Sequence, residues 1–402
     1  MDSIYQKTFF SFKEFKINIK FSSRAIVKKQ KHSDLLTSKK ISCWAQDLGF
    51  SDLAVVDVES PNNLTDPMKY YKKWIDQGFH GEMKYLKDSI NVRKNPNTLF
   101  DGVKRVIMVS MNYLPRANKS NWINAEIQGL QKPEKATISL YARGKDYHRV
   151  MRKRLAKLAK KISAEVGSYG FRACVDSAPL LEVELAQKSG LGWRGKNTLL
   201  LKRNEGSFFF LGSLLTDLPL KTTHGHIQKN LCGTCTACMD ICPTKAFIGP
   251  YVLDAQKCIS YLTIEKKGII EEPLRHLIGN RIYGCDDCQL VCPWNKYAKL
   301  STLKEFDVQN GLDNISLINL FKWSETQFLQ NHSGSPILRI GYERWLRNIA
   351  IGLGNAANKQ KENKLANDGT IAEIKKTLMI RLNEKRSILT PHIIWAIGQC
   401  EQ

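Results

Sequence analysis

The sequence lacks any long apolar run. Its 402 residues are 43% hydrophobic and 25% charged, and no uninterrupted hydrophobic stretch approaches the roughly 20 residues that a membrane-spanning helix needs. The amino terminus also lacks the apolar segment of a secretory signal. We therefore expect a globular protein without membrane segments, long enough for two or three domains.

Acidic residues are few relative to basic ones. The chain has 61 Lys and Arg against 38 Asp and Glu, a formal net charge of +23. This excess favours polyanionic partners, with nucleic acid as the first candidate and an anionic membrane as the second. An ordinary enzyme from a lysine-rich proteome would have the same balance, because charge reports on partners and not on the fold.

Cysteine is rare outside one segment. Eight of the eleven cysteines lie between Cys232 and Cys292, and the others are Cys43, Cys174 and Cys400. Closely spaced cysteines in a chain without a secretory segment favour metal ligation over disulfides. We therefore expect the reducing cytoplasm as the compartment.

The chain divides into four parts by pattern. Residues 1–34 are lysine-rich without periodicity, which predicts a flexible basic extension. Helical patterns over 34–50 and 146–167 alternate with strand patterns over 52–58, 103–114 and 206–218, which predicts an α/β domain over 35–222. Residues 223–297 form a cysteine-rich unit. In the helical region 298–402, residues 344–356 and 389–400 are alike and about forty-five residues apart, which favours HEAT-type repeats over an ordinary helical tail.

The first cysteine run predicts iron–sulfur chemistry. Its spacing is C-x2-C-x2-C-x3-C-P from Cys232 to Pro243, which is typical of bacterial ferredoxins. Three thiolates at this spacing bind one [4Fe–4S] cube, and the fourth binds the other cluster in two-cluster proteins. A second cluster is therefore predicted.

The second run, which ends at Cys292, is one ligand short, because Ile282 stands where a full run would have cysteine. The isolated Cys258 is the candidate that completes it. Zinc is the alternative, but zinc sites favour paired C-x2-C units separated by longer loops. Crossed ligation then gives two sets of four: Cys232, Cys235, Cys238 and Cys292 for one cluster, and Cys242, Cys258, Cys285 and Cys288 for the other.

The sequence also lacks a nucleotide-binding motif. The segment GLGWRGKN at 190–197 has three glycines but neither the Walker spacing nor a dinucleotide fingerprint. From spacing alone, Asp176 between a strand pattern and a helix pattern is best interpreted as a helix cap. The segment SLYARGKDYHRV at 139–150 is best interpreted as a solvated turn, with Asp146 as the cap of the following helix.

Several segments taken together resemble one family. FHGEMKYL at 79–86, YARGKDYH at 141–148, VDSAPLLE at 175–182, GLGWRGKNTLL at 190–200, GSFFFLG at 206–212 and YGCDDCQLVCPWN at 283–295 occur in order with the eight cysteines. In this combination the chain is similar to the epoxyqueuosine reductases from about residue 35 to its end. The cysteine runs alone would be less specific, since many ferredoxins have them.

The resemblance implies a cobalamin-dependent iron–sulfur enzyme, related to reductive dehalogenases, that completes queuosine biosynthesis in tRNA. It would reduce epoxyqueuosine at the wobble position of the anticodon, with an external low-potential electron donor. Clusters deliver electrons singly, so a two-electron carrier such as cob(I)alamin suits the removal of an epoxide oxygen. We expect a monomer in the cytoplasm with no membrane partner.

The implied fold class is α+β. It would comprise an α/β cobalamin-binding domain of the reductive-dehalogenase or nitroreductase type over 35–222. A two-cluster ferredoxin-like domain over 223–297 and HEAT-like helices that bind tRNA over 298–402 would follow.

The resemblance also assigns site residues. Asp176 matches the family's proton donor, which reverses its interpretation as a cap and requires a raised pKa. The expected tRNA contacts are Arg339, Arg344 and Arg347, next to a Trp345 that suits a core better than a stacking platform. Val183 stands where the family often has a basic residue, so a contact there is in question. The residues expected to line cobalamin, each with a local turn or cap role as the alternative, are Arg93, Ser139, Asp176, Lys196, Asn197, Ser260, Asp286 and Asp287.

Three other functions fit parts of the sequence. A dehalogenase-like reductase would share the clusters and cobalamin, although those relatives usually carry a twin-arginine export signal, and none is visible here. A non-catalytic electron-transfer protein would bind no corrinoid. A nucleic-acid binder with structural clusters would keep the same affinity for RNA when its cobalt is redox-silent.

Overall fold

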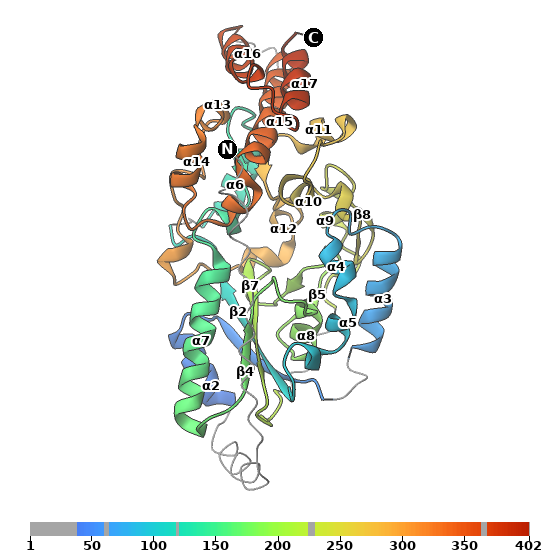
Figure 1. The fold of residues 1–402 in the computed structure, drawn as a ribbon, viewed down its shortest axis with the longest axis vertical. Helices are drawn as coiled ribbons and strands as arrows, with labels where there is room; N and C mark the ends of the chain where they lie inside the picture. Colours follow the sequence, from blue (N-terminus) through green and yellow to red (C-terminus); the bar gives the residue numbers. More distant parts are fainter. Residues whose placement is uncertain (1–37, 60–63, 118–119, 224–229, 363–367, 402) are drawn as a thin grey trace, which may run out of the picture.

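The computed structural model describes residues 38–59, 64–117, 120–223, 230–362 and 368–401. The expected basic extension at 1–34 lies outside these residues. Figure 1 shows a central sheet flanked by helices in one half of the molecule, with the cysteine-rich segment and the carboxy-terminal helices in the other half. Within the described residues, no helix combines the length and apolar character that crossing a membrane requires.

The main sheet has four strands in the order β1-β2-β7-β4: β1 (Asp52–Asp57), β2 (Arg105–Asn112), β7 (Phe209–Thr216) and β4 (Phe171–Cys174). Ile107 in β2 is paired with Val55 on one side and Leu214 on the other. The three strands expected from the sequence are confirmed. All three pairings in this sheet are antiparallel, so the alternation of helices and strands does not produce the parallel sheet typical of α/β domains.

Helices cover both faces of this sheet (Figure 1). One face packs against α2 (Ser38–Asp47) and α7 (Tyr147–Val166), where Ile107 contacts a core that includes Met151 and Leu155. The other face packs against α3 (Thr65–Asp76) and α8 (Glu182–Lys188), where Met108 joins a core with Leu185. Burial on both faces explains why β2 and β7 are almost continuously apolar in sequence.

Helix α7 begins and ends as its sequence predicts. The Asp146 carboxylate accepts a hydrogen bond from the backbone N–H of His148, which confirms Asp146 as the cap. The helix ends before Gly167, whose positive φ of 83° suits glycine.

The cysteine-rich segment contains short elements only. They are α9 (Ala237–Asp240), β8 (Phe247–Gly249), β9 (Val252–Leu253), α10 (Ile259–Ile264), α11 (Glu272–Ile278), β10 (Arg281–Tyr283) and α12 (Asp287–Leu290). Strand β10 pairs in parallel with β3 (Thr137–Ile138) of the preceding region. A single apolar core contains Ala136, Ile259, Ile282 and residues up to Ala396, so the segment shares its core with its neighbours.

The carboxy-terminal helices are α13 (Leu317–Lys322), α14 (Glu325–Asn331), α15 (Gly341–Glu362), α16 (Asp368–Leu382) and α17 (Thr390–Glu401). The two segments that are alike in sequence lie in α15 and α17, which pack together. A Cβ atom on Gly354 would lie 2.6 Å from the Trp395 ring and 3.0 Å from the Ala396 Cα, so the small residue permits this close approach. The HEAT-type repeat and the domain boundaries stay predictions.

The remaining elements are short. The helices are α4 (Lys84–Asp88), α5 (Ile90–Lys94) and α6 (Trp122–Leu130), and the strands are β5 (Trp193–Arg194) and β6 (Leu200–Leu201). Six 3-10 turns complete the described elements: Pro96–Thr98, Leu140–Ala142, Ala255–Lys257, Pro293–Tyr297, Lys304–Phe306 and Pro336–Ile340.

Candidate active site

A cavity of about 490 Å³ lies where the main sheet meets the cysteine-rich segment. Asp176, which follows β4, lines this cavity together with Cys258 and Cys288 of the cysteine-rich segment. Two smaller cavities share wall residues with it: both contain Tyr147, and one of them also contains Asp176. Together, the cavity of about 490 Å³ and its two smaller neighbours offer room for one large ligand and for a second ligand next to it.

The first set of four cysteines lies together. Burial and then the charges of Cys292, Cys232 and Cys235 raise the pKa of Cys238 to about 11. Burial also raises the pKa of Cys292, and the charges of Cys232 and Cys235 add to this effect. The four thiols expected to share a cube therefore lie within electrostatic reach of one another, although Cys292 is distant in sequence.

The second set also converges. Burial raises the pKa of the Cys258 thiol, and the charge of Cys242 adds to it. Burial likewise raises the pKa of Cys288, with a contribution from Cys258, and Cys288 in turn raises the pKa of Cys285. Cys238 of the first set also acts on Cys288, so the two sets are neighbours.

The second set faces the cavity and the first does not. Cys242, Cys258, Cys285 and Cys288 all line the cavity, whereas Cys235 of the first set is exposed at the surface. No three His, Cys, Asp or Glu side chains of the described residues converge as ligands of a single metal ion.

Gly284, immediately before Cys285, allows the second cysteine run to pack close to Ser139. It has a positive φ of 70°, and a Cβ atom there would lie 2.6 Å from the Cβ of Ser139. Any other residue would push the segment away from Ser139. The adjacent Asp286 is buried and accepts hydrogen bonds from the Ser139 hydroxyl at 2.6 Å and the Leu140 N–H at 2.7 Å.

Asp176 does not cap a helix. The next helix, α8, has Leu181 at its N-cap position without a side-chain hydrogen bond, so the interpretation from spacing alone was wrong. Asp176 instead has a positive φ of 44°, which aspartate tolerates better than most residues. Its carboxylate accepts hydrogen bonds from the Tyr147 hydroxyl and from Nε2 of His148, the latter at 3.2 Å.

His148 lies between two carboxylates. Its Nδ1 is 2.8 Å from Asp146 and its Nε2 is 3.2 Å from Asp176. Burial disfavours the imidazolium, but hydrogen bonds to both carboxylates and their charges outweigh it and raise the pKa of His148 to about 9. The Asp176 side chain is 57% exposed to the open cavity, although the walls around it desolvate the carboxylate and so raise its pKa. Hydrogen bonds from His148 and Tyr147 outweigh this effect and hold the pKa below its usual value. At neutral pH the proton therefore sits on His148.

This charge state corrects the sequence expectation for Asp176. A raised pKa was required for a proton donor, and the contacts of the carboxylate lower it instead. Sequence reasoning also interpreted Tyr147 and His148 as part of a solvated turn, and it missed their contact with Asp176. The only available signal was that they stand in one of the motifs shared with the family.

Glu182 is a second carboxyl group next to Asp176. It accepts a hydrogen bond from the Ser213 hydroxyl at 3.3 Å and lines one of the smaller cavities with Asp176. Burial and the negative charge of Asp176 raise the pKa of Glu182 to about 8. Sequence reasoning did not single out this residue, although a carboxylate at the end of an apolar segment is a usable signal.

Comparisons with known proteins agree with this arrangement. Residues 93–177 match the family model described as "Epoxyqueuosine reductase QueG, DUF1730", and residues 231–295 match a 4Fe-4S double cluster binding domain. The epoxyqueuosine reductase of Pseudomonas aeruginosa is 51% identical over 319 residues, covering 79% of this chain and 85% of the relative. That of Escherichia coli is 45% identical over 365 residues, covering 90% of this chain and 88% of the relative.

The chain belongs to the epoxyqueuosine reductase family. It is also similar to a crystal structure of epoxyqueuosine reductase with a tRNA-Tyr epoxyqueuosine-modified tRNA stem loop. That match has a TM-score of 0.73 and 24% identity, covering 92% of this chain and all of the other. At this identity the likeness shows the fold, and the double cluster domain shows two [4Fe–4S] clusters.

In this member of the epoxyqueuosine reductase family, six of the eight residues expected to contact cobalamin line the cavity. Asn197 is the most informative, because its side-chain Nδ2 is buried without a hydrogen-bond partner. An unpaired buried amide donor facing a cavity suits a carboxamide-rich ligand such as a corrin. The six are Ser139, Asp176, Asn197, Ser260, Asp286 and Asp287.

Arg93 and Lys196 are not among the residues that line the cavity of about 490 Å³, so their contacts with cobalamin stay a prediction. Arg93 is buried in α5 and donates to the Leu180 carbonyl at 2.9 Å, so it braces the segment that follows Asp176. The Lys196 ammonium donates to the carbonyls of Gly233 at 2.7 Å and Cys235 at 2.9 Å. Lys196 therefore holds the loop of the first cysteine set.

The three arginines expected to bind tRNA have different environments. Arg347 is fully buried and donates to the carbonyls of Leu262, Lys266 and Gly268, so its expected tRNA contact is wrong. Arg344 donates to three backbone carbonyls. Arg339 is exposed, pairs with Glu265 at 2.6 Å and lines the main cavity. Trp345 is buried in the core as expected.

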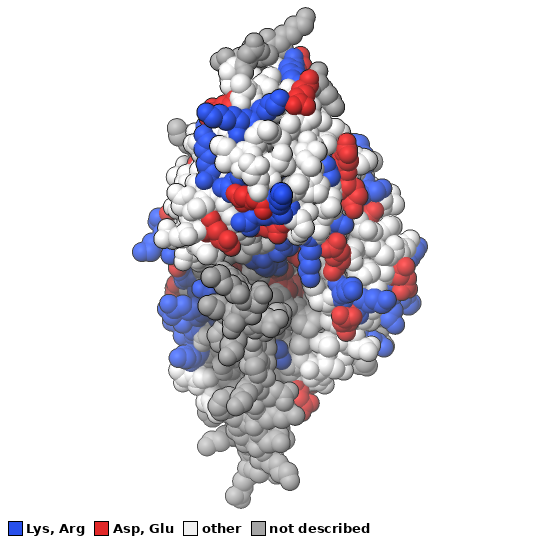
Figure 2. Space-filling view, turned by 45° about the horizontal axis from the view of Figure 1, so that its top comes forward, with Lys and Arg blue, Asp and Glu red and all other residues white. Residues whose placement is uncertain are grey.

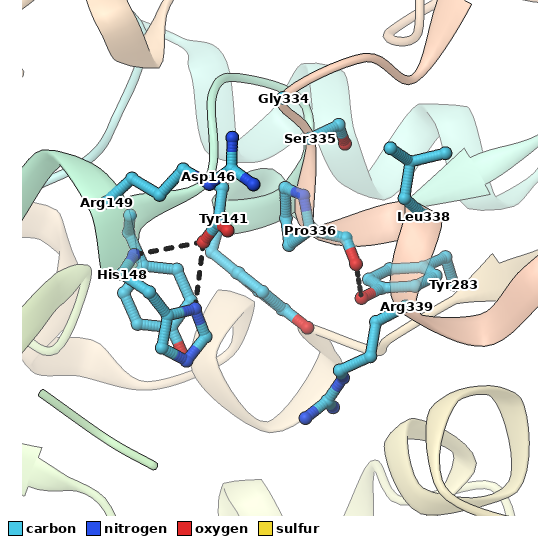
Figure 3. Close-up of a pocket in the computed structure, with 11 residues that line it drawn as sticks. Tyr141, Asp146, His148, Arg149, Tyr283, Gly334, Ser335, Pro336, Leu338 and Arg339 are labelled. Carbon is cyan, nitrogen blue, oxygen red and sulfur yellow. Dashed lines mark hydrogen bonds and ion pairs between the residues drawn. The ribbon is translucent and has the colours of Figure 1, made fainter. Parts of the chain in front are cut away.

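Figure 3 shows the smaller cavity of about 280 Å³ next to Asp146 and His148. Tyr141 and Arg339 project into the same space in this view. Tyr283 forms another wall, with its hydroxyl bonded to the Pro336 carbonyl at 3.0 Å. Aromatic planes and a guanidinium side by side suit a nucleobase.

Proposed function

We propose that this chain reduces epoxyqueuosine to queuosine at the wobble position of tRNA. The observation that carries the proposal is the cavity itself, which is lined both by cysteines that can hold an electron carrier and by Asp176, whose carboxylate contacts His148. Converting an epoxide to an alkene consumes two electrons and two protons and releases water. The cysteine-bound carrier would supply the two electrons, the Asp176–His148 pair would supply one proton to the leaving oxygen, and solvent would supply the second proton as that oxygen departs as water.

The cysteine sets define a direction for the electrons. The first set, Cys232, Cys235, Cys238 and Cys292, reaches the surface at Cys235. The second, Cys242, Cys258, Cys285 and Cys288, borders the cavity. An external low-potential donor would therefore deliver electrons at the first set. When bound, the clusters supply electrons one at a time, and cobalamin in the cavity supplies them as a pair.

The residues that would hold cobalamin are those around the cavity. Asn197 would donate to a corrin carboxamide with its unpaired Nδ2. Ser260 stands two residues after Cys258 and Asp287 directly before Cys288, so a ligand that they contact lies against the second cluster. Asp286 is already engaged by Ser139 and Leu140, so its part is to fix this wall.

The proton would come from the Asp176–His148 pair. His148 holds a proton at neutral pH and is in hydrogen-bonding contact with Asp176. Transfer from Nε2 to the carboxylate gives a neutral acid that faces the cavity, and this acid protonates the leaving oxygen. Asp146 on the far side of the ring orients the imidazole and stabilises its charge.

The cavity of Figure 3 is the proposed site for the substrate nucleoside. Its aromatic walls suit a nucleobase, and Arg339 stands between this cavity and the larger one. Arg339 would therefore contact the incoming tRNA. The proposal also includes HEAT-like packing of the carboxy-terminal helices, which the contact of α15 with α17 supports. It includes a cytoplasmic location, which the free thiols of the cysteines favour. The monomeric state stays a prediction from the sequence.

A two-substrate assay tests this function. The chain carrying both clusters and cobalamin is incubated without oxygen, with a chemical reductant and either epoxyqueuosine-containing tRNA or a halogenated phenol. We expect a nucleoside lighter by one oxygen atom in digests of the tRNA, and no halide. Halide release without queuosine would favour the dehalogenase-like alternative. Omission of cobalamin should abolish the product.

A further inference from the structure

The solvent-facing side of α7 is strongly basic. Six of its Lys and Arg side chains are exposed, and we call them the basic stripe. Figure 2 shows basic side chains gathered on the flank where α7 lies in Figure 1. The stripe consists of Arg149, Arg152, Lys153, Lys157, Lys160 and Lys161.

The spacing of the stripe follows the helix. Arg149, Lys153 and Lys157 are four residues apart, so they lie on one side of α7 about 6 Å apart along its axis. The opposite side is fixed, because Met151 and Leu155 are fully buried against the sheet. A rigid row of cations suits the phosphates of a nucleic-acid strand, which are the groups that dominate affinity for such ligands.

The charge of the stripe is not neutralised from within the molecule. The one acidic side chain in α7, Glu165, pairs with Lys40 at 2.7 Å. Arg154, which lies outside the stripe, pairs with Glu305 at 2.8 Å. Within the described part of the chain, no ion pair involves any of the six stripe residues. Cations that lack internal partners remain available to an external polyanion.

The stripe begins at the mouth of the active site. The first turn of α7 carries Tyr147 and His148, which contact Asp176. Arg149 lines the cavity that we assign to the substrate nucleoside. The whole of α7 is 20 residues long, or about 30 Å. A strand with one nucleotide in the cavity could therefore continue along the stripe.

We propose that the basic stripe of α7 binds the phosphate backbone of the substrate tRNA while the wobble nucleoside occupies the active site. This inference rests on the proposed function, because it takes tRNA as the substrate. It places the phosphate contacts on the catalytic domain, whereas the sequence had suggested the carboxy-terminal arginines. Phosphate contacts of this kind give affinity and register, and the cavity gives specificity.

Charge reversal tests the stripe. The variant carries Lys153→Glu, Lys157→Glu and Lys160→Glu, none of which lies in the catalytic site. The matched control carries Lys69→Glu, Lys72→Glu and Lys73→Glu on exposed positions of α3, with the same change in net charge. Binding of an epoxyqueuosine-modified anticodon stem-loop is followed by fluorescence anisotropy over a range of salt concentrations, with the holoenzyme. Circular dichroism checks the folding of both.

For the stripe variant we expect Kd to rise by about tenfold or more at low salt, and the slope of log Kd against log salt to flatten by about two to three. KM for tRNA should rise while kcat at saturating tRNA stays the same. Equal affinity and slope for the two triple variants would overturn the proposal. The proposal would also be overturned if the stripe variant bound tRNA normally and was impaired only when a protein donor reduced the enzyme, because the stripe would then bind the donor. If binding weakens but no variant forms queuosine, the stripe stands and the proposed function fails.

Discussion

Replacing Asp176 by asparagine should stop the reaction and leave the cofactors bound. Asparagine matches the shape of aspartate and tolerates the positive φ of 44° at this position, so the local backbone should not change. Neither cysteine set includes Asp176. The amide, however, cannot take a proton from His148 and pass it to the leaving oxygen.

The magnitude follows from two losses. A positioned general acid contributes about 100- to 10,000-fold to a rate. In addition, His148 loses one of the two carboxylates that raise its pKa from 6.5 to about 9, a difference worth about 3 kcal/mol. Near neutral pH a larger fraction of the imidazole is then deprotonated. We therefore expect a loss in the upper half of the range for Asp176→Asn.

The assay is a single turnover with a chemical reductant and saturating tRNA, with queuosine measured by mass spectrometry. Iron content and bound corrinoid are measured on the same sample. The control is Asp101→Asn, an exposed aspartate outside the site, which should behave as the wild type. A rate within tenfold of the wild type for Asp176→Asn, with both cofactors present, would refute the reasoning.

Three further predictions concern other residues. In a profile of kcat against pH, turnover should fall as pH rises through about 9, where His148 loses its proton. Asp146→Asn should move that fall to lower pH, because it removes one of the carboxylates that raise the pKa of His148. Asn197→Asp, which keeps the acceptor and removes the unpaired donor, should weaken cobalamin binding about tenfold in a titration. Arg347→Met should lower the free energy of unfolding by about 3 kcal/mol, because it leaves buried carbonyls unpaired.

Each of these has an outcome that contradicts it. A pH profile that is identical in Asp146→Asn and the wild type would exclude His148 as the titrating group. Unchanged corrinoid affinity in Asn197→Asp would remove the amide from the cofactor site. For Arg347, the comparison is Arg339→Met, which should keep its thermal stability and lose affinity for tRNA. If instead Arg347→Met kept its stability and lost affinity for tRNA, the assignment of Arg347 as a tRNA contact would be restored.

The strands and the cysteine sets could be predicted because local pattern determines them. Strand β2 is buried on both faces, so its sequence is almost continuously apolar and can be recognised as a strand. The cysteine spacing reflects the geometry of a cube. The assignment of Cys292 to the first run stays a prediction, which the closeness of its thiol to Cys232, Cys235 and Cys238 supports. The antiparallel pairing was not predictable, because alternating helices and strands do not specify which strands become neighbours.

The charge state of the site could not be predicted, because it depends on contacts between distant segments. Asp176 and His148 are 28 residues apart, and nothing in either segment states that they touch. The same limit explains Arg347, whose spacing in an amphipathic helix suits exposure as well as burial. Its partners are the carbonyls of Leu262 in α10 and of Lys266 and Gly268 in the loop that follows, about 80 residues away in sequence.

The central claim is that the cavity joins a two-electron supply to a proton source at an epoxide. The most direct test is a titration of the loaded enzyme with limiting reductant and an excess of epoxyqueuosine tRNA under anaerobic conditions, counting queuosine by nucleoside mass spectrometry. The account predicts one queuosine for every two electrons delivered. An enzyme with verified clusters and cobalamin that consumes electrons without forming queuosine would contradict it.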